Sequence, residues 1–213
     1  NTDEITGLFL ADWAAQQVDD LRFKEGEDGS TLQALGVALI SVYVAANADL
    51  RVRAVEWPFA VPLVDPETGE VLGPDVHGVF DLVLDGDVIV ELKTAARAYD
   101  AGTLARNLQF SAYAYAYRRL YGRDPLIRVT ALLKQKKPRI DTYEPARTAA
   151  DDRRFVAVAA AVAKAITVEA FPPNPGWQCD DCEYAGRCEA VGATRSMARF
   201  PENTAVKCAA ATG

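Results

Sequence analysis

The sequence predicts an α/β fold in which helices flank a central mixed sheet. Apolar residues recur at helical spacing near the start of the chain and again in an alanine-rich stretch from about residue 148 to 170. Segments rich in valine and aromatic residues lie between these helices, and a further helical segment interrupts them. This alternation of helix, strands, helix, strand and helix around one core is typical of α/β proteins.

Composition narrows the class of protein. The chain has 213 residues, of which 50% are hydrophobic and 25% are charged, as in an ordinary globular domain. A net charge of −7 argues against a simple basic DNA-coating protein and is compatible with carboxylates gathered around metal ions. No signal peptide is visible, and the longest apolar stretches, such as residues 155–163, are too short to span a membrane. We therefore expect a cytoplasmic protein without a membrane partner.

Two helices are expected in residues 1–48, which we interpret as an N-terminal helical region packed on the core. The first covers residues 5–21 and ends before a polar, glycine-containing break at 25–30. Ser30 or Thr31 is expected to cap a second helix that runs to about Asn47. This second helix is apolar on most sides, which predicts a buried packing helix.

Residues 49–170 are expected to form the core, and residues 171–213 a cysteine-containing segment and tail. A turn at 65–69 and a glycine stop at Gly122 punctuate the core. Prolines at 172, 173 and 175 end the last long helix. The pattern predicts strands at 51–64, 70–72, 76–84, 88–94, 126–133 and 139–143, and helices at 104–121 and 148–170.

The hairpin formed by residues 76–94 carries the clearest chemistry. A two-residue loop at 85–86 would place Asp81 opposite Val90, whereas a three-residue loop at 85–87 places it opposite Glu91. We choose the second register because it separates charged from apolar side chains. Asp81, Glu91 and Lys93 then share one face, and the other face holds Phe80, Leu82, Leu84, Val88, Val90 and Leu92.

Two carboxylates facing each other across a strand pair repel unless a cation lies between them. Mg²⁺ and Mn²⁺ prefer oxygen ligands and few protein groups, and phosphate and water fill their remaining positions. A lysine beside such an ion would orient or deprotonate a water molecule and stabilise charge on phosphate. The alternative is a surface salt bridge with one extra acid, and the spacing alone favours neither.

Asp81 followed by Glu91-Leu92-Lys93 resembles the D…E-x-K core of the PD-(D/E)XK nuclease superfamily. Gly78 and Thr94 resemble its RecB-type branch, as does the Q-x-x-x-Y pair formed by Gln109 and Tyr113. The resemblance implies a restriction-endonuclease-like core, with Mg²⁺ or Mn²⁺ held by Asp81, Glu91 and the Leu92 carbonyl. It also implies that Lys93 activates water while Gln109 and Tyr113 lie beside the metal and position the strand or the lysine.

One feature of the family pattern is missing. The family often has a further acidic or histidine ligand on an upstream helix, but residues 31–47 contain no Asp, Glu or His. Glu56 is the best substitute for this metal ligand, although a solvated strand position fits it equally well. His77 has the same strand parity as Asp81, but a lone histidine is more often structural or merely exposed.

The four cysteines all follow residue 178, which argues against a secreted disulfide framework and favours a local metal site in a reducing cytosol. Cys179, Cys182 and Cys188 resemble the C-terminal cysteines of iron–sulfur RecB-type nucleases, which include CRISPR-adaptation exonucleases and AddB-like subunits. This resemblance favours a [4Fe–4S] cluster over Zn²⁺, with a structural role. In that pattern one cysteine precedes the core, so either Cys208 is the fourth ligand, or an N-terminal cysteine is lost, or the metal is zinc.

The expected function is metal-dependent hydrolysis of DNA by an exonuclease acting on single strands or ends, in repair, recombination, or phage or CRISPR DNA processing. A protein partner in such a complex is part of this expectation. Alternatives are a catalytically silent nuclease-fold subunit for DNA binding or assembly, and a zinc-stabilised interaction domain without nucleic acid. Basic residues cluster at 118–119 with Arg123, at 134–139 and at 153–154, which favours a path for DNA despite the net charge. The cluster at 134–139 follows a strand and is expected to contact phosphates, although exposed basic turns of this kind are common.

Overall fold

The computed structural model describes residues 1–17, 23, 26–170, 174, 176–179 and 182–190. The chain divides into two compact units, Asn1–Lys164 and Ala165–Gly213. The first unit holds a five-stranded sheet and most of the helices. The elements are α1 (Thr2–Ala15), α2 (Gly29–Ala46), β1 (Val52–Val61), β2 (Val76–Leu84), β3 (Val88–Ala95), α3 (Ala101–Ala105), α4 (Leu108–Tyr121), β4 (Leu126–Leu133), β5 (Arg139–Tyr143), α5 (Ala149–Thr167), a 3₁₀ helix η1 (Trp177–Cys179) and α6 (Ala185–Ala190).

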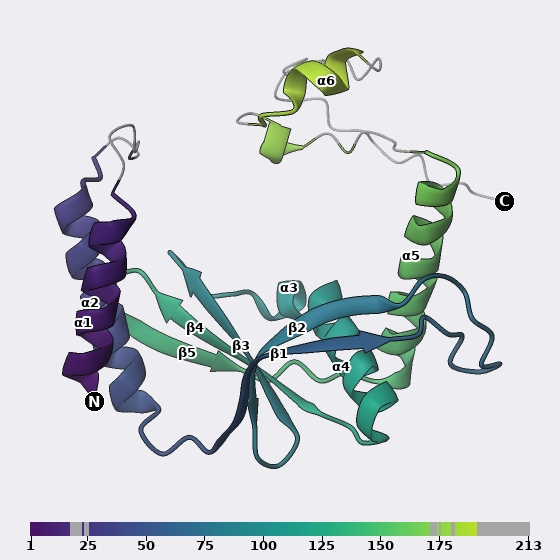
Figure 1. Cartoon of the computed structure of the whole chain (residues 1–213), viewed down its shortest axis with the longest axis horizontal. Helices are drawn as coiled ribbons and strands as arrows, with labels where there is room; N and C mark the ends of the chain where they lie inside the picture. The colour runs from purple at the N-terminus through teal and green to yellow at the C-terminus, as the bar shows by residue number, and fades with distance from the viewer. Residues whose placement is uncertain (18–22, 24–25, 171–173, 175, 180–181, 191–213) are drawn as a thin grey trace, which may run out of the picture. The chain divides into compact units, whose positions relative to one another are not determined.

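The sheet is mixed and has the strand order β1-β2-β3-β4-β5. Strands β3 and β4 are parallel, and the other neighbours are antiparallel. The predicted α/β fold with a mixed sheet flanked by helices is therefore confirmed. Strands β2 and β3 pair only over a short stretch next to their loop, and beyond it β1 and β2 diverge from β3, β4 and β5 like the arms of a fork (Figure 1).

The hairpin register agrees with the prediction. Leu84 pairs with Val88 and Leu82 with Val90, which leaves residues 85–87 as a three-residue loop. Positive φ angles at Gly86 and Asp87, 81° and 62°, allow the chain to reverse in this loop. A small apolar cluster forms on one side of the hairpin from Leu82, Leu84 and Val90, with Val88 and Leu50 packed against it.

Phe80 departs from the prediction, because it belongs to the main core and not to the small cluster. Phe80 and Val83 lie three residues apart yet both face the main core, so the in–out alternation of β2 shifts between them. The neighbouring strand is also irregular there, since Glu56 has φ 45° between the paired residues Val55 and Trp57. The single apolar face predicted for the hairpin is therefore wrong at Phe80.

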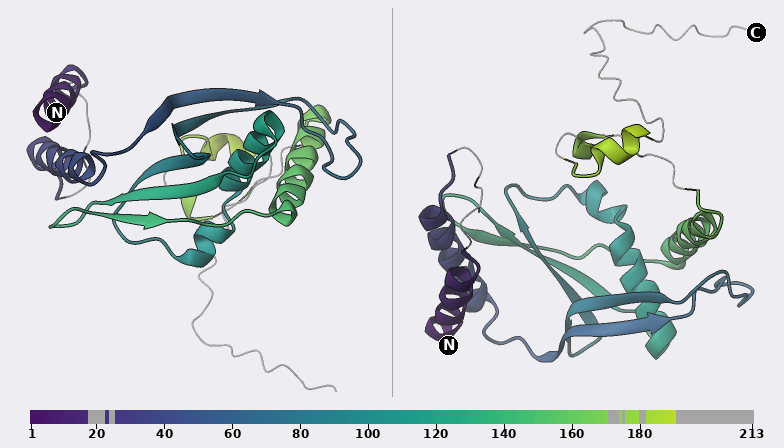
Figure 2. Two further views of the ribbon diagram at one scale, coloured as in Figure 1. Left: turned by 90° about the horizontal axis from the view of Figure 1, so that it is seen from below. Right: turned by 45° about the horizontal axis from the view of Figure 1, so that its top comes forward.

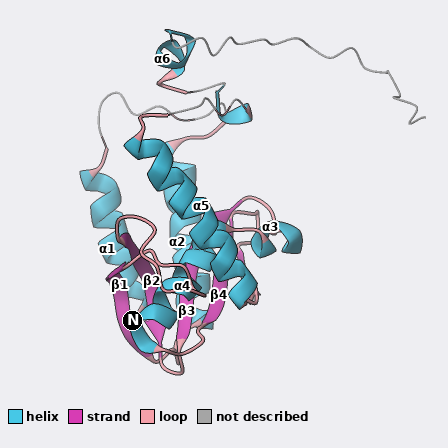
Figure 3. Ribbon diagram, turned by 90° about the vertical axis from the view of Figure 1, so that its right-hand side faces the viewer, coloured by secondary structure: helices cyan, strands magenta, loops and turns pink. Residues whose placement is uncertain are grey.

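Helix α4 supplies the aromatic centre of the core. Tyr115 and Tyr117 are almost fully buried, and Tyr115 donates a hydrogen bond to the Pro62 carbonyl at 2.8 Å. The ring of Tyr115 also contacts Phe155 of α5, with ring centroids 5.4 Å apart. Figure 3 shows α4 and α5 alongside the strands of the sheet. Burial of these rings is the main apolar contribution to the stability of this side of the sheet.

The single helix predicted at 104–121 is wrong, because the structure has two helices, α3 and α4. Asn107 lies between them with extended backbone angles, and its side chain accepts a hydrogen bond from the Gln109 N–H at 2.8 Å. This is an N-cap, which starts a new helix instead of continuing the previous one. The predicted stop at Gly122 is confirmed, since Gly122 adopts the left-handed conformation with φ 64°.

The N-terminal helices lie side by side (Figure 2), and α2 also contacts β4 and β5. Asp28 caps α2 by accepting the Thr31 N–H at 2.8 Å, so neither Ser30 nor Thr31 is the cap. Both hydroxyls instead donate to the Asp28 carboxylate, which competes better as an acceptor because it is charged. Leu39 is the one fully buried residue of α2, so the prediction of a buried packing helix is wrong for most of its length.

Helix α2 also corrects the expectation about apolar length. Among the helices in the described part of the chain, Gly29–Ala46 alone is long and apolar enough to cross a membrane. The criterion is weak, because core helices of globular proteins and signal sequences near the N-terminus meet it as well.

Other boundaries shift slightly. The predicted return strand at 70–72 is reduced to one bridge between Val64 and Val71. Helix α1 ends at Ala15, whereas part of the predicted helix, residues 18–21, lies outside the described residues. Helix α5 ends at Thr167, three residues earlier than predicted, where no proline is yet present. Of the proline segment, residues 171–173 and 175 lie outside the described residues.

Candidate active site

Four polar side chains meet where β3 passes the first turns of α4. Gln109 Nε2 donates to Glu91 Oε1 at 2.8 Å and to the Tyr113 hydroxyl at 3.0 Å. Lys93 Nζ forms an ion pair with Glu91 Oε1 and donates to Gln109 Oε1 at 3.3 Å. The amide of Gln109 therefore holds Glu91, Lys93 and Tyr113 in one connected network.

Local structure explains why these residues meet. Glu91 and Lys93 are two apart on β3, so their side chains project to the same face of the sheet. Gln109 and Tyr113 are four apart on α4, so they lie on the same face of the helix. The cap by Asn107 fixes the first turn of α4, in which Gln109 lies. The sequence analysis did not identify Asn107, although an asparagine one residue before an apolar helix is a recognisable cap.

Glu91 is the most unusual group of the site because its carboxylate is only 2% exposed. Its Oε1 atom is bound by Lys93 and Gln109, but its Oε2 atom is buried without a hydrogen-bond partner in the described part of the chain. A buried carboxylate oxygen without a partner is costly, and a cation is the group that compensates it best. The donor set of Glu91 therefore fits a divalent metal ion.

Asp81 lies at the point where the two arms of the sheet separate. Its Oδ2 atom accepts a hydrogen bond from the Leu92 N–H at 3.0 Å, so the side chain bridges β2 and β3 where the backbone ladder has ended. The N–H and C=O of one strand residue project toward the same edge, so the Leu92 carbonyl also faces β2. Asp81 therefore lies beside the backbone of Leu92, the residue that follows Glu91 on β3.

Electrostatics links the two carboxylates to Tyr113. Burial raises the pKa of the Tyr113 hydroxyl above its usual value, and the negative charges of Glu91 and Asp81 raise it further. Both carboxylates therefore act on the same hydroxyl. Tyr113 remains a neutral hydrogen-bonding group at physiological pH.

The structure does not gather every predicted ligand. Glu56 is exposed and lies on β1 between the residues that pair with the neighbours of Asp81. His77 is also exposed, and it pairs with Ala60 near the far end of β2. Within the described ranges, no three His, Cys, Asp or Glu side chains lie close enough to hold a metal ion together. Of the predicted acidic and histidine ligands, Asp81 and Glu91 therefore remain, without a third such group in the described residues.

An apolar cavity of about 300 Å³ lies on the other face of β3, opposite to Glu91, and the sequence analysis did not predict it. It lies between the N-terminal helices and the arm of the sheet that carries Lys93. Its lining consists of Ile5, Ile40, Tyr43, Val44, Leu92, Lys93, Thr94 and Leu132. The only sequence signal was the 40, 43, 44 spacing on α2, which indicates one helical face but not what the face contacts.

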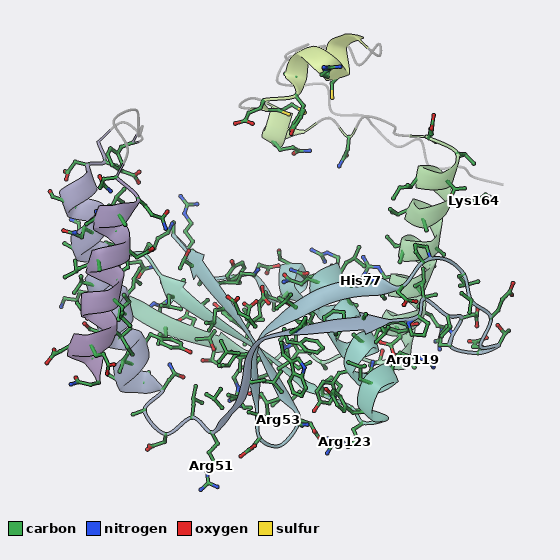
Figure 4. The ribbon with its side chains drawn as sticks, viewed as in Figure 1. Arg51, Arg53, His77, Arg119, Arg123 and Lys164 are labelled. Carbon is green, nitrogen blue, oxygen red and sulfur yellow. The ribbon has the colours of Figure 1, made fainter. Side chains whose placement is uncertain are left out.

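The basic clusters are divided between structural and exposed roles. Arg118 belongs to a basic cluster expected along a DNA path, but it donates to Asp124, Asp152 and the Arg147 carbonyl at 2.6–2.8 Å. Arg139 pairs with Asp141. Arg53 lies over the rings of Trp57 and Tyr121. Arg51, Arg53 and Arg123 point toward the lower side of the molecule in Figure 4.

The cysteine segment belongs to the second unit. Cys179 ends the short 3₁₀ helix η1, its sulfur accepting the Gly176 N–H at 3.5 Å, and Cys188 lies in α6. The Cys188 N–H donates to the Tyr184 carbonyl at 3.1 Å, which closes the turn between Cys182 and Cys188. Cys208 lies outside the described residues, so the predicted fourth thiolate stays a prediction.

The fold is that of an α/β protein with a five-stranded mixed sheet flanked by helices. The family model for the PD-(D/E)XK nuclease superfamily matches residues 4–189. The chain therefore belongs to the PD-(D/E)XK nuclease superfamily.

Solved structures agree at the level of the fold. A crystal structure from Eubacterium rectale, named "Putative exonuclease", matches with a TM-score of 0.53 and 12% identity, covering 88% of this chain and 74% of that chain. The structure of SSO0001 is 14% identical and covers 88% of this chain and 97% of that chain, with a TM-score of 0.46 that is too low to support an argument. No curated protein matches the chain significantly.

Proposed function

We propose that the protein is a divalent-metal-dependent deoxyribonuclease, and specifically an exonuclease that acts on single strands or DNA ends. The observation that carries this proposal is the buried Glu91 carboxylate beside Lys93, whose Oε2 atom has no hydrogen-bond partner among the described residues. Membership of the nuclease superfamily supports a nucleic-acid substrate. The name of the Eubacterium rectale protein agrees with an exonuclease.

In this proposal Asp81, Glu91 and the Leu92 carbonyl hold Mg²⁺ or Mn²⁺. Bound there, the cation would neutralise phosphate charge and lower the pKa of a water molecule. Lys93, whose side chain is 35% exposed, reaches solvent and orients the attacking water. Gln109 holds the lysine against Glu91, and Tyr113 supports the amide of Gln109.

The main alternative is a catalytically silent nuclease-fold subunit that binds DNA or assembles with other proteins. The observation in its favour is that the described residues offer two carboxylates and no third acidic or histidine ligand. Phosphate and water complete the coordination of Mg²⁺ in many sites with few protein ligands, so the active enzyme is the better proposal.

For the second unit we retain the proposal of a structural [4Fe–4S] cluster, with Zn²⁺ as the alternative. The C-x-x-C spacing of Cys179 and Cys182, with Cys188 close behind, supports it. Such a cluster requires reduced cysteines, which agrees with the proposed cytoplasmic location. We also retain the proposal of a protein partner in a repair, phage or CRISPR complex.

The test is Lys93→Ala, assayed on end-labelled single- and double-stranded DNA with Mn²⁺. We expect cleavage to fall by about 10²–10⁴-fold, the usual contribution of a positioned acid–base group. Lys164→Ala is the matched control, because Lys164 is exposed on α5 and lies outside the basic clusters. If a folded Lys93→Ala protein cleaves at the rate of the wild type, the assignment is wrong.

A further inference from the structure

Arg147 is a half-buried arginine that the chemistry proposed so far does not use. It lies in the loop between β5 and α5, and its Nη2 atom donates to the Leu104 carbonyl at 2.7 Å and to the Asn107 carbonyl at 3.4 Å. The guanidinium also lies over the Phe110 ring, 5.6 Å from its centroid. One side chain therefore connects the end of α3 to the start of α4.

These contacts lie at the break between the two helices. Leu104 belongs to the last turn of α3, and Asn107 is the N-cap residue of α4. An arginine side chain stabilises the carbonyl groups at the end of a helix by donating to them. The periodicity of residues 104–121 alone predicts one continuous helix, so Arg147 stabilises the interrupted arrangement that the structure has.

The guanidinium is held in place from a third part of the chain. The Arg147 carbonyl accepts a hydrogen bond from Arg118 at 2.8 Å, and Arg118 pairs with the buried Asp152 of α5. The Nε atom of Arg147 is buried without a hydrogen-bond partner among the described residues, and burial lowers the pKa of the side chain below its usual value. The protein therefore keeps a cation at this junction although its burial is costly.

The junction determines where the glutamine of the candidate active site lies. Asn107 accepts the Gln109 N–H through its side chain at 2.8 Å, while its carbonyl accepts from Arg147. The Gln109 amide in turn binds Glu91 at 2.8 Å and Lys93 at 3.3 Å. A shift of the junction would therefore displace the amide that holds both polar groups of β3.

We propose that Arg147 is a positioning residue of the candidate active site, which fixes the α3–α4 junction and thereby keeps the Gln109 amide against β3. This inference rests on the proposed nuclease function and adds a residue to it. The role is indirect, because the guanidinium binds the junction and acts on the reacting groups through Gln109. Small displacements of positioning groups are expensive in catalysis, since reaction rates depend steeply on the geometry of the reacting atoms.

The test is Arg147→Ala in the full-length protein, assayed on end-labelled single-stranded DNA with Mn²⁺ at a temperature where circular dichroism shows the native fold. We expect kcat to fall by about 10–100-fold. KM should stay unchanged, because the amide of Gln109 orients reacting groups and does not bind the length of the strand. Arg147→Lys keeps the charge but lacks the planar fork, so its kcat should be intermediate.

Arg128→Ala is the matched control. Arg128 is also a half-buried arginine in an ion pair, with Glu144 at 2.8 Å, and neither residue belongs to the α3–α4 junction. Its replacement should lower the melting temperature and leave kcat unchanged.

Two measurements separate positioning from a general loss of stability. In a Gln109→Ala background, Arg147→Ala should lower kcat little further, because the two residues act through one amide. Guanidinium at millimolar concentration should restore part of kcat in Arg147→Ala, whose missing group it replaces, and none in Gln109→Ala. If Arg147→Ala does not fold, Arg147→Lys takes its place in the same cycle.

The outcomes separate the two proposals. An unchanged kcat in the folded Arg147 variants, or effects of Arg147 and Gln109 that are fully additive, overturns the positioning role and leaves the nuclease intact. An equal loss of kcat in Arg128→Ala also overturns it, because any weakening of the fold would then suffice. Absence of any cleavage by the wild type overturns the nuclease and the positioning role together.

Discussion

Glu91 is the most unusual residue of the site, because its charged carboxylate is buried. One of its oxygens accepts a hydrogen bond from Gln109 and pairs with Lys93, and the other is buried without a partner in the part of the chain that the structure describes. A carboxylate with hydrogen bonds to both oxygens would be stable in the core without a ligand. The Glu91 carboxylate instead needs a further group, such as a cation, to compensate its buried oxygen. Predictions at the scale of single residues follow from Glu91 and from its neighbour Tyr113.

Glu91→Gln keeps the volume of the side chain and removes its charge. We expect Mn²⁺ to raise the melting temperature of the wild type but not that of Glu91→Gln, because an ion that binds only the native state stabilises it. The gain is about 2.7 kcal/mol at a hundredfold excess over the dissociation constant. Differential scanning calorimetry measures the shift. Glu70→Gln, an exposed carboxylate, is the control, and an equal shift in Glu91→Gln would show that the ion binds elsewhere.

Tyr113 should limit stability in alkaline solution. Its pKa is raised by burial and by two carboxylates, so above pH 10 the unfolded chain loses this proton while the native protein retains it. The free energy of unfolding then decreases as the pH rises, by at most about 1.4 kcal/mol per pH unit for this group. Urea denaturation of Tyr113→Phe from pH 9 to 12 should show a shallower decrease than the wild type. Identical slopes would mean that Tyr113 ionises normally.

At the scale of elements, the fork between β2 and β3 places the site. The ladder between these strands stops after Leu82 and Val90, and Asp81 then binds the Leu92 backbone through its side chain. The short hairpin keeps both carboxylates near its loop, and α4 brings the glutamine from another part of the chain. The stacked rings of Phe59 and Phe80 hold β2 in position, and their packing requires the glycine at position 78.

Gly78 on β2 is a test of that packing. A Cβ atom there would lie 2.3 Å from the Phe59 ring, which stacks on Phe80 at 4.5 Å between centroids. We expect Gly78→Ala to lower the free energy of unfolding by about 1–3 kcal/mol through overpacking. Gly7→Ala is the matched control, because nothing lies within 4 Å of its added Cβ on α1. It should raise stability by about 0.4–1 kcal/mol, measured by urea denaturation. Equal effects would contradict the packing argument.

At the scale of the whole molecule, the chain combines two compact units with different bases for stability. The unit Asn1–Lys164 has a buried aromatic core, whereas in the described part of Ala165–Gly213 beyond α5 no residue is fully buried. A segment with so little core is stabilised most readily by a bound metal or cluster. The acidic net charge of −7 belongs to the whole chain and does not prevent local binding of DNA at the site.

The metal content of the second unit is therefore a prediction for the intact protein. A [4Fe–4S] cluster would make anaerobically purified protein brown, with iron and acid-labile sulfide in equal amounts. Cys182→Ser should lose the colour and most of the iron, while Ser41→Ala, far from any thiol in sequence, should retain both. If elemental analysis finds zinc and no iron, the cluster proposal is wrong and the bound metal is zinc.

Several features of the fold and site followed from the sequence because they depend on local periodicity. The three-residue loop of the hairpin was predicted from the separation of apolar and charged residues, and Glu91 and Lys93 share a face because strand side chains alternate. Gln109 and Tyr113 lie on one face of α4 because they are four residues apart. Their functional roles remain proposals.

The remaining features depend on residues that are distant in the sequence, and only the tertiary structure decided them. Phe80 faces the main core, next to an irregular stretch of the neighbouring strand. Arg118 forms an ion pair with Asp152 on α5. The apolar face of α2 lies against Leu92 and Leu132 because the N-terminal helices pack on the sheet, which the sequence does not reveal. Periodicity fixes which side chains share a face, whereas long-range packing determines what that face meets.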